Sequence, residues 1–82
     1  MNAPIGTSTL EIVYSTEQIG AAVRAARKEQ GLRQPDLAAA CGTSVRFIVE
    51  LERGKPTAQI GKVLHVLNLL GLRLTLGPTP QP

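Results

Sequence analysis

Apolar residues recur at helical spacing near the start of this chain, which is 82 residues long. Ile19 and Val23 lie four positions apart in a stretch whose other residues are mainly small or charged. Ser15 stands three residues before Gln18, the spacing of a capping box, in which two side chains satisfy free backbone N–H groups at a helix start. Gly31 supplies the positive φ that commonly ends a helix. The sequence therefore predicts a first helix that begins after Ser15 and ends at Gly31.

Two short helices are predicted next, over residues 34–41 and 45–53. Pro35 suits the first turn of a helix, where the N–H that it lacks would have had no partner. Gly42 is expected to end the first of these helices, and Ser44 is a good N-cap for the second. Only a tight turn is left between the two.

A fourth helix is predicted over 58–70, with Thr57 as its N-cap. Beyond it, residues 72–76 (LRLTL) alternate strictly between apolar and polar, which predicts a short C-terminal β-strand. Residues 10–14 (LEIVY) alternate in the same way and indicate a second strand less strongly. The expected fold class is therefore all-α with a short strand added at the end.

A length of 82 residues limits the chain to one small domain. Its core must be aliphatic, since Tyr14 and Phe47 are the only large aromatic residues. We expect this domain to span 10–76, between a flexible N-terminal arm over 1–9 and a disordered, proline-rich tail over 77–82. A single cysteine and a single histidine exclude an intrachain disulfide and an internal two-histidine or multi-cysteine metal site. No apolar run is long enough to span a membrane, so we expect a cytoplasmic protein. We also expect no cofactor.

The net charge is +3, from nine basic and six acidic residues, and the surplus lies between residues 15 and 62. Such a charge permits a nucleic-acid partner without requiring one. The sequence contains no nucleophile–base pair, metal-ligand set or glycine-rich phosphate loop. We therefore expect a binding protein and not an enzyme.

Residues 34–53 have the pattern of a helix-turn-helix, in which two short helices cross closely at a steep angle. Ala38 supplies the small side chain that such a crossing needs, and Gly42 supplies the positive φ of the turn. On the second helix Ile48 and Leu51 point to one side, and most of the charged residues point to the other.

One stretch, QPDLAAACGTSVRFIVELERGK, resembles the helix-turn-helix of phage repressors and of the xenobiotic-response-element (XRE) regulators. The resemblance covers about residues 17–71. A second stretch, ELERGKPTAQIGKVLHVLNLLGLRLTL, is similar to the HipB-like antitoxins of type II toxin–antitoxin systems, in which the final strand helps to hold a dimer. The resemblance implies a compact Cro/lambda-repressor-like domain of four to five helices, in a bacterial, nucleoid-associated protein.

Three residues are assigned to DNA phosphates by this resemblance. Gln34 matches the glutamine that opens the family's second helix, where it contacts a phosphate and braces the recognition helix. Arg33 replaces the threonine or serine usual before it, so that a cap is lost and a phosphate-reaching charge is added. Lys55, just after the recognition helix, is expected to contact a phosphate as well.

Five residues are assigned to the DNA bases or their surroundings, because the first turns of a recognition helix meet base edges. Ser44 is expected both to cap the helix and to contact DNA, with capping alone as the alternative. Arg46 is expected to pair with a guanine, with a solvated surface charge as the alternative. Val45 replaces a polar residue of the family, so it either contacts a thymine methyl group or reads nothing. Val49 replaces a small polar residue and leaves an apolar side chain on the expected DNA face. Glu50 either accepts from a cytosine or lies in solvent.

Arg27 and Glu52 match an ion pair that, in the family, ties the first helix to the recognition helix. We expect this pair to be structural and largely buried. Removal of either partner would then leave the other poorly compensated.

The predicted fourth helix is too apolar for a monomer. One face is expected to pack on the core: Ile60, Val63, Leu64, Leu67 and Leu70. Val66 and Leu69 lie on a second face, which needs a second partner. Leu72, Leu74 and Leu76 of the last strand need a partner too, because an unpaired strand is marginal. A two-fold homodimer meets both needs, and pairing of the two predicted strands within one chain is the alternative.

These observations predict a dimeric repressor that binds double-stranded DNA at an inverted-repeat operator. By resemblance, it would be an antitoxin that binds a HipA-like kinase toxin and represses the shared operon. The alternatives are a free-standing XRE-family regulator without a toxin, and a protein-interaction module that has lost DNA binding.

Overall fold

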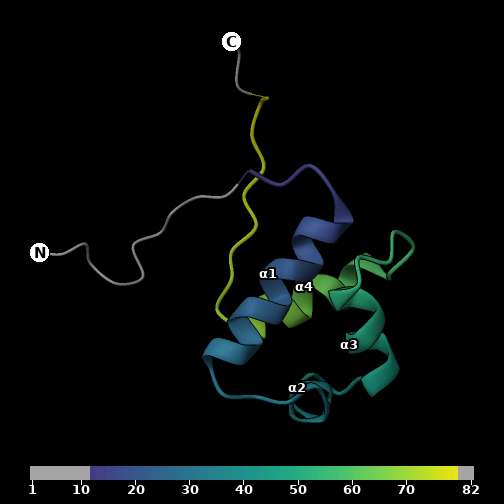
Figure 1. Ribbon diagram of the computed structural model, residues 1–82. Helices are drawn as coiled ribbons and strands as arrows, with labels where there is room; N and C mark the ends of the chain where they lie inside the picture. The colour runs from purple at the N-terminus through teal and green to yellow at the C-terminus, as the bar shows by residue number, and fades with distance from the viewer. Residues whose placement is uncertain (1–11, 80–82) are drawn as a thin grey trace, which may run out of the picture.

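The computed structural model describes residues 12–79 and shows four helices packed around one centre (Figure 1). They are α1 (Thr16–Glu29), α2 (Gln34–Cys41), α3 (Val45–Glu52) and α4 (Ile60–Leu69). The segment after α4 leaves the helices as an extended chain. The predicted all-α helix-turn-helix fold is confirmed.

The helix boundaries follow from the local signals in the sequence. The Ser15 side chain accepts from the backbone N–H of Gln18 at 3.2 Å, and Ser44 accepts from that of Phe47 at 3.0 Å. Gly42, with φ at 67°, turns the chain between α2 and α3, a conformation that a side chain would strain. The two short helices therefore begin and end within a residue of the sequence prediction.

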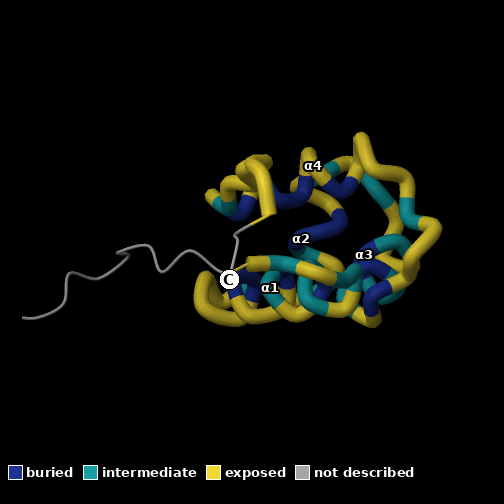
Figure 2. The backbone as a smooth tube through the Cα atoms, turned by 90° about the horizontal axis from the view of Figure 1, so that it is seen from above, coloured by how far each residue is buried: buried dark blue, intermediate teal, exposed yellow. Residues whose placement is uncertain are grey.

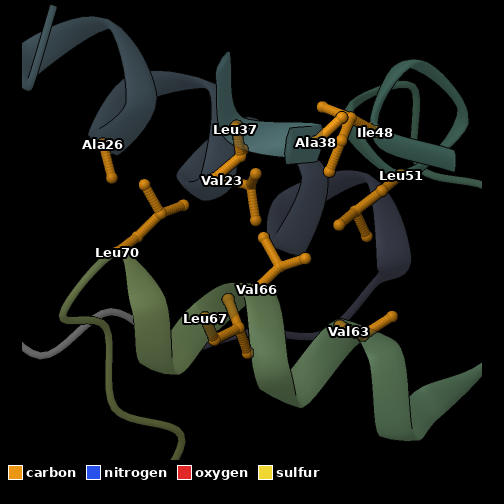
Figure 3. Close-up of a cluster of buried hydrophobic side chains, with 10 residues drawn as sticks. All are labelled: Val23, Ala26, Leu37, Ala38, Ile48, Leu51, Val63, Val66, Leu67 and Leu70. Carbon is orange, nitrogen blue, oxygen red and sulfur yellow. The ribbon is translucent and has the colours of Figure 1, made fainter. Parts of the chain in front are cut away.

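The core is aliphatic, as the composition predicts, and its side chains point toward one another from all four helices (Figure 3). Its members are Val23, Ala26, Leu37, Ala38, Ile48, Leu51, Val63, Val66, Leu67 and Leu70. The burial colours of Figure 2 show the same division, with buried positions on the inner sides of the helices. Burial of these side chains is the main favourable term for a domain of this size.

Helix α4 differs from its prediction in both start and orientation. It begins at Ile60 and not at 58, because residues 56–57 form a turn and Thr57 caps nothing. Val66, predicted on the outer face, is only 1% exposed and belongs to the core. Ile60 and Leu64, predicted toward the core, are 66% and 40% exposed. The face of α4 that packs on the core therefore contains Val63, Val66 and Leu67. The prediction that Val66 belongs to a dimer interface is wrong.

The predicted strands are also corrected. Residues 12–79 contain no β-strand: 72–76 are extended but hydrogen-bond to no neighbouring strand, and 12–14 do not pair with them. A strand needs a partner for its backbone groups, and within the described residues none lies beside this segment. The predicted arm over 1–9 lies outside the described residues, as do residues 10–11 and 80–82.

Two further observations concern membranes and metals. No helix within 12–79 is long and apolar enough to cross a membrane. In the same residues, no three His, Cys, Asp or Glu side chains are grouped so that they could hold a metal ion.

Cys41 packs against the core, and its partial burial raises the pKa of its thiol.

Candidate nucleic-acid interface

The predicted DNA-contacting residues lie at the start of α2, along α3 and in the turn after α3. Arg33 precedes α2 and Gln34 opens it, and Ser44 precedes α3. Arg46, near the start of α3, has a side chain that is 85% exposed. Lys55 follows α3 in a turn that is held to α1, because Thr16 Oγ1 donates to the Gly54 carbonyl oxygen at 2.7 Å.

A buried cluster behind α3 fixes its position. Arg27 Nε lies 2.6 Å from Glu52 Oε2, and the two side chains are 9% and 3% exposed. Arg27 also donates from Nη2 to Glu52 Oε1 at 3.0 Å and from Nη1 to the Leu32 carbonyl oxygen at 2.9 Å. The hydrogen bond to Glu52 raises the pKa of Arg27. The structure thus brings the predicted pair together and ties α1 to α3.

Gln34 joins the same cluster from α2. Its Nε2 donates to Glu52 Oε1 at 3.1 Å. Glu52 therefore receives donors from both α1 and α2, and one carboxylate links three helices. The bracing part of the role expected for Gln34 is thereby present in the free protein.

Glu50 lies between two cations on the exposed side of α3. Its Oε2 accepts from Arg46 Nε at 3.2 Å, and its Oε1 accepts from Lys55 Nζ at 2.9 Å. The hydrogen bonds from Lys55 and Arg46 lower the pKa of the Glu50 carboxyl, which is therefore ionised at neutral pH. From the sequence, these three residues are each predicted to contact DNA, but their arrangement in one cluster is not. The four-residue spacing of Arg46 and Glu50 was the available signal.

Arg33 pairs with Asp36, which is not among the predicted site residues. Asp36 Oδ1 accepts from Arg33 Nη2 at 3.0 Å, and Oδ2 accepts from Arg33 Nε at 3.1 Å. Oδ2 also accepts from the Arg33 backbone N–H at 2.8 Å, which satisfies a donor at the start of α2. The hydrogen bonds from Arg33 lower the pKa of Asp36 and raise that of Arg33. An acidic residue three positions after an N-cap was the signal for this contact.

The uncharged residues of α3 have different surroundings. Ser44 uses its hydroxyl oxygen to cap the helix, as described above. Val45 is 42% exposed, whereas Val49 is only partly exposed. The outer side of α3 therefore presents an apolar side chain at its first residue, next to the charged cluster.

Several exposed leucines lie at the C-terminal end of α4 and in the segment that follows it. Leu69 is 39% exposed, Leu74 is 42% and Leu76 is 89%, whereas Leu72 packs against the core. An open hollow of about 330 Å³ lies between the end of α4 and the following segment, and its lining includes Leu64 and Leu74. Of the five residues predicted for the dimer interface, Leu69, Leu74 and Leu76 are thus exposed, Leu72 is partly buried and Val66 is buried.

The sequence matches known regulators. Residues 23–76 match the helix-turn-helix family model. The uncharacterized HTH-type transcriptional regulator y4mF of Sinorhizobium fredii is 62% identical over 64 residues, which are 78% of this chain and 84% of that protein. A second uncharacterized HTH-type regulator of the same organism, y4dL, is 34% identical over 67 residues, which are 82% of this chain but only 34% of y4dL.

Solved structures with the same fold include HipB proteins. A chain of a HipA-HipB-O2-O3 complex superposes with a TM-score of 0.78 at 25% identity, covering 87% of this chain and 100% of that chain. A chain of a HipB-O4 20mer complex gives 0.78 at 24% identity, with the same coverage of both chains. The family match, the 62% identical relative and the fold agree with one another. This chain belongs to the helix-turn-helix family of transcriptional regulators.

Proposed function

We propose that this protein is a dimeric, sequence-specific DNA-binding repressor of the HipB-like antitoxin class. It would bind an inverted-repeat operator and a HipA-like kinase toxin, and repress the operon that encodes both. One observation carries the DNA-binding part of the proposal: α3 carries an 85% exposed Arg46 near its start and is held from behind by the buried Arg27–Glu52 pair. A rigid helix with an exposed arginine near its N-terminus suits recognition in the major groove.

The assigned contacts follow from the chemistry of each group. Arg46 would donate two hydrogen bonds to O6 and N7 of a guanine, the commonest specific contact of arginine with DNA. Val45 would pack on a thymine methyl group in the same groove. Lys55 and the start of α2, near Gln34, would bind phosphates.

Dimerisation is supported by the exposed leucines at the end of α4. Leu69, Leu74 and Leu76 are large apolar side chains that a single chain leaves in solvent. The extended segment after α4 also offers unpaired backbone groups to a second copy. A two-fold dimer would place two recognition helices about 34 Å apart, so half-sites of the operator should be about one helical turn apart.

The DNA-binding proposal is tested by a gel shift on the region upstream of the protein's own gene. We expect binding that is tighter than to a random duplex of the same length and that weakens strongly between about 50 and 200 mM salt. Arg46→Ala should weaken specific binding by about tenfold to a hundredfold, because a bidentate guanine contact is lost. Arg24→Ala, which removes an exposed arginine of α1, is the matched control and should bind like the wild type. Equal binding of wild type and Arg46→Ala would contradict the assignment.

The toxin part is supported by the HipB chains among the structural neighbours, one of them in a complex with HipA. We expect a gene for a HipA-like kinase beside the gene of this protein, and co-purification of the two products. Absence of such a gene would favour the free-standing regulator. A kinase complex without any duplex binding would favour the interaction module, for which the exposed Val45 is the supporting observation.

A further inference from the structure

The three cations assigned to DNA are paired with carboxylates in the free protein. Glu50 holds both Arg46 and Lys55, at 3.2 and 2.9 Å. Asp36 holds Arg33 at 3.0 Å. The cluster of Glu50 with its two partners thus carries one net positive charge.

Of the two carboxylates, Glu50 has no other function in the structure. Asp36 also accepts the Arg33 backbone N–H and so helps to begin α2. Glu50, in contrast, makes side-chain hydrogen bonds only to Arg46 and Lys55 within the described residues. Ion pairs at a protein surface typically contribute less than about 1 kcal/mol each to stability. A small gain in stability is therefore a weak reason for an acidic residue at the centre of a surface assigned to DNA.

We propose that Glu50 determines how strongly this protein discriminates between DNA sequences, because it occupies Arg46 and Lys55 until a matched duplex replaces it. The inference rests on the proposed DNA-binding function. On a random duplex, phosphates compete with the carboxylate for the same donors, and the displaced Glu50 is left beside negative charge. That outcome lowers the affinity for any phosphate backbone.

A matched duplex compensates Glu50 in a way that phosphates cannot. A G·C pair offers the acceptors O6 and N7 on guanine and a donor, the N4 amino group, on cytosine. Arg46 takes the acceptors, and Glu50, one helical turn further along α3, accepts from a cytosine amino group. The negative charge thus weakens nonspecific binding more than specific binding, and the ratio of the two affinities rises.

The test compares Glu50→Gln with Glu29→Gln in the full chain. Both variants remove one negative charge, but Glu29 is an exposed residue at the end of α1, outside α2 and α3. Gln keeps the length of the side chain and an acceptor for Arg46, so α3 should keep its shape. Equal melting temperatures by circular dichroism verify that both variants are folded.

The readouts are the affinities for a random duplex and for the duplex from the upstream region, each measured from about 50 to 200 mM salt. Each added phosphate contact steepens the slope of log K against log salt by about 0.9 and changes the affinity about threefold over this range. We expect Glu50→Gln to bind the random duplex about three- to tenfold tighter at low salt than Glu29→Gln, with a slope steeper by about one per chain. Its preference for the upstream duplex should fall by a similar factor.

Two results overturn the inference, and they are distinguishable. A wild-type preference for the upstream duplex with identical behaviour of the two variants would refute the role of Glu50 alone. No wild-type preference for the upstream duplex would refute the proposed function, and the inference with it.

Discussion

Replacement of Glu52 with alanine is expected to lower the free energy of unfolding by about 3–5 kcal/mol, the usual effect of breaking a buried ion pair. The substitution would leave the Arg27 guanidinium buried with only the Leu32 carbonyl oxygen as a partner. Gln34 would lose its acceptor at the same time. Small domains are stable by only about 5–15 kcal/mol, so the variant should be substantially destabilised and partly unfolded at moderate temperature.

Urea unfolding followed by circular dichroism measures this effect. Glu29→Ala is the matched control, and this exposed substitution should change stability by less than about 0.5 kcal/mol. Replacement of both partners by apolar residues, Arg27→Met with Glu52→Leu, should restore much of the loss, because no uncompensated charge remains. A loss below about 1 kcal/mol for Glu52→Ala would show that the pair is not buried in solution.

The double variant also separates stability from DNA recognition. It should fold, yet Gln34 would have no carboxylate to hold it against α3. We expect weaker binding to the upstream duplex even where the fold is restored, since the hydrogen bond that holds Gln34 to α3 is lost. Glu52 thus stabilises the domain through Arg27 and holds Gln34 at the predicted DNA-binding surface.

The short helices were predictable because their signals are local. Ser15 and Ser44 cap the helices that follow them, and Gly42 has the positive φ that the turn requires. Each of these effects depends on a few neighbouring residues and needs no knowledge of the rest of the chain. The pairing of Arg27 with Glu52, in contrast, came from the family resemblance, because no local rule joins residues 25 positions apart.

The orientation of α4 was not predictable from its pattern. Apolar residues surround most of this helix, so periodicity alone does not decide between Leu64 and Val66 as core residues. Packing against the other helices decides it, and Val66 is buried. The prediction of a strand over 72–76 was wrong for a related reason. A strand needs a partner strand, and an alternating sequence does not identify one.

The charged cluster on α3 was predictable only in part. The spacing of Arg46 and Glu50 favours an ion pair on any helix. The approach of Lys55 depends on the turn at Gly54, whose carbonyl oxygen is bonded to Thr16 of α1. The local sequence does not show how this turn is held against α1.

The second large effect is expected at Gly20, where α1 crosses α3 too closely for any side chain. A Cβ atom at Gly20 would lie 2.7 Å from the carbonyl oxygen of Glu52 and closer still to that of Leu51. Both oxygens belong to the backbone of α3, so they cannot move away without shifting the helix. We expect Gly20→Ala to lower the free energy of unfolding by about 3 kcal/mol, although alanine is otherwise preferred in helices.

Gly61→Ala is the matched control, because Gly61 is also helical and a Cβ there would meet no atom within 4 Å. This variant should be stabilised by about 0.5–1 kcal/mol. Thermal and urea unfolding of the two variants should therefore shift in opposite directions. Since Gly20 contacts the end of α3 that carries Glu52, the same shift should also displace the recognition helix and weaken binding to the upstream duplex. A stabilised Gly20→Ala variant would mean that the two helices are further apart than the structure places them.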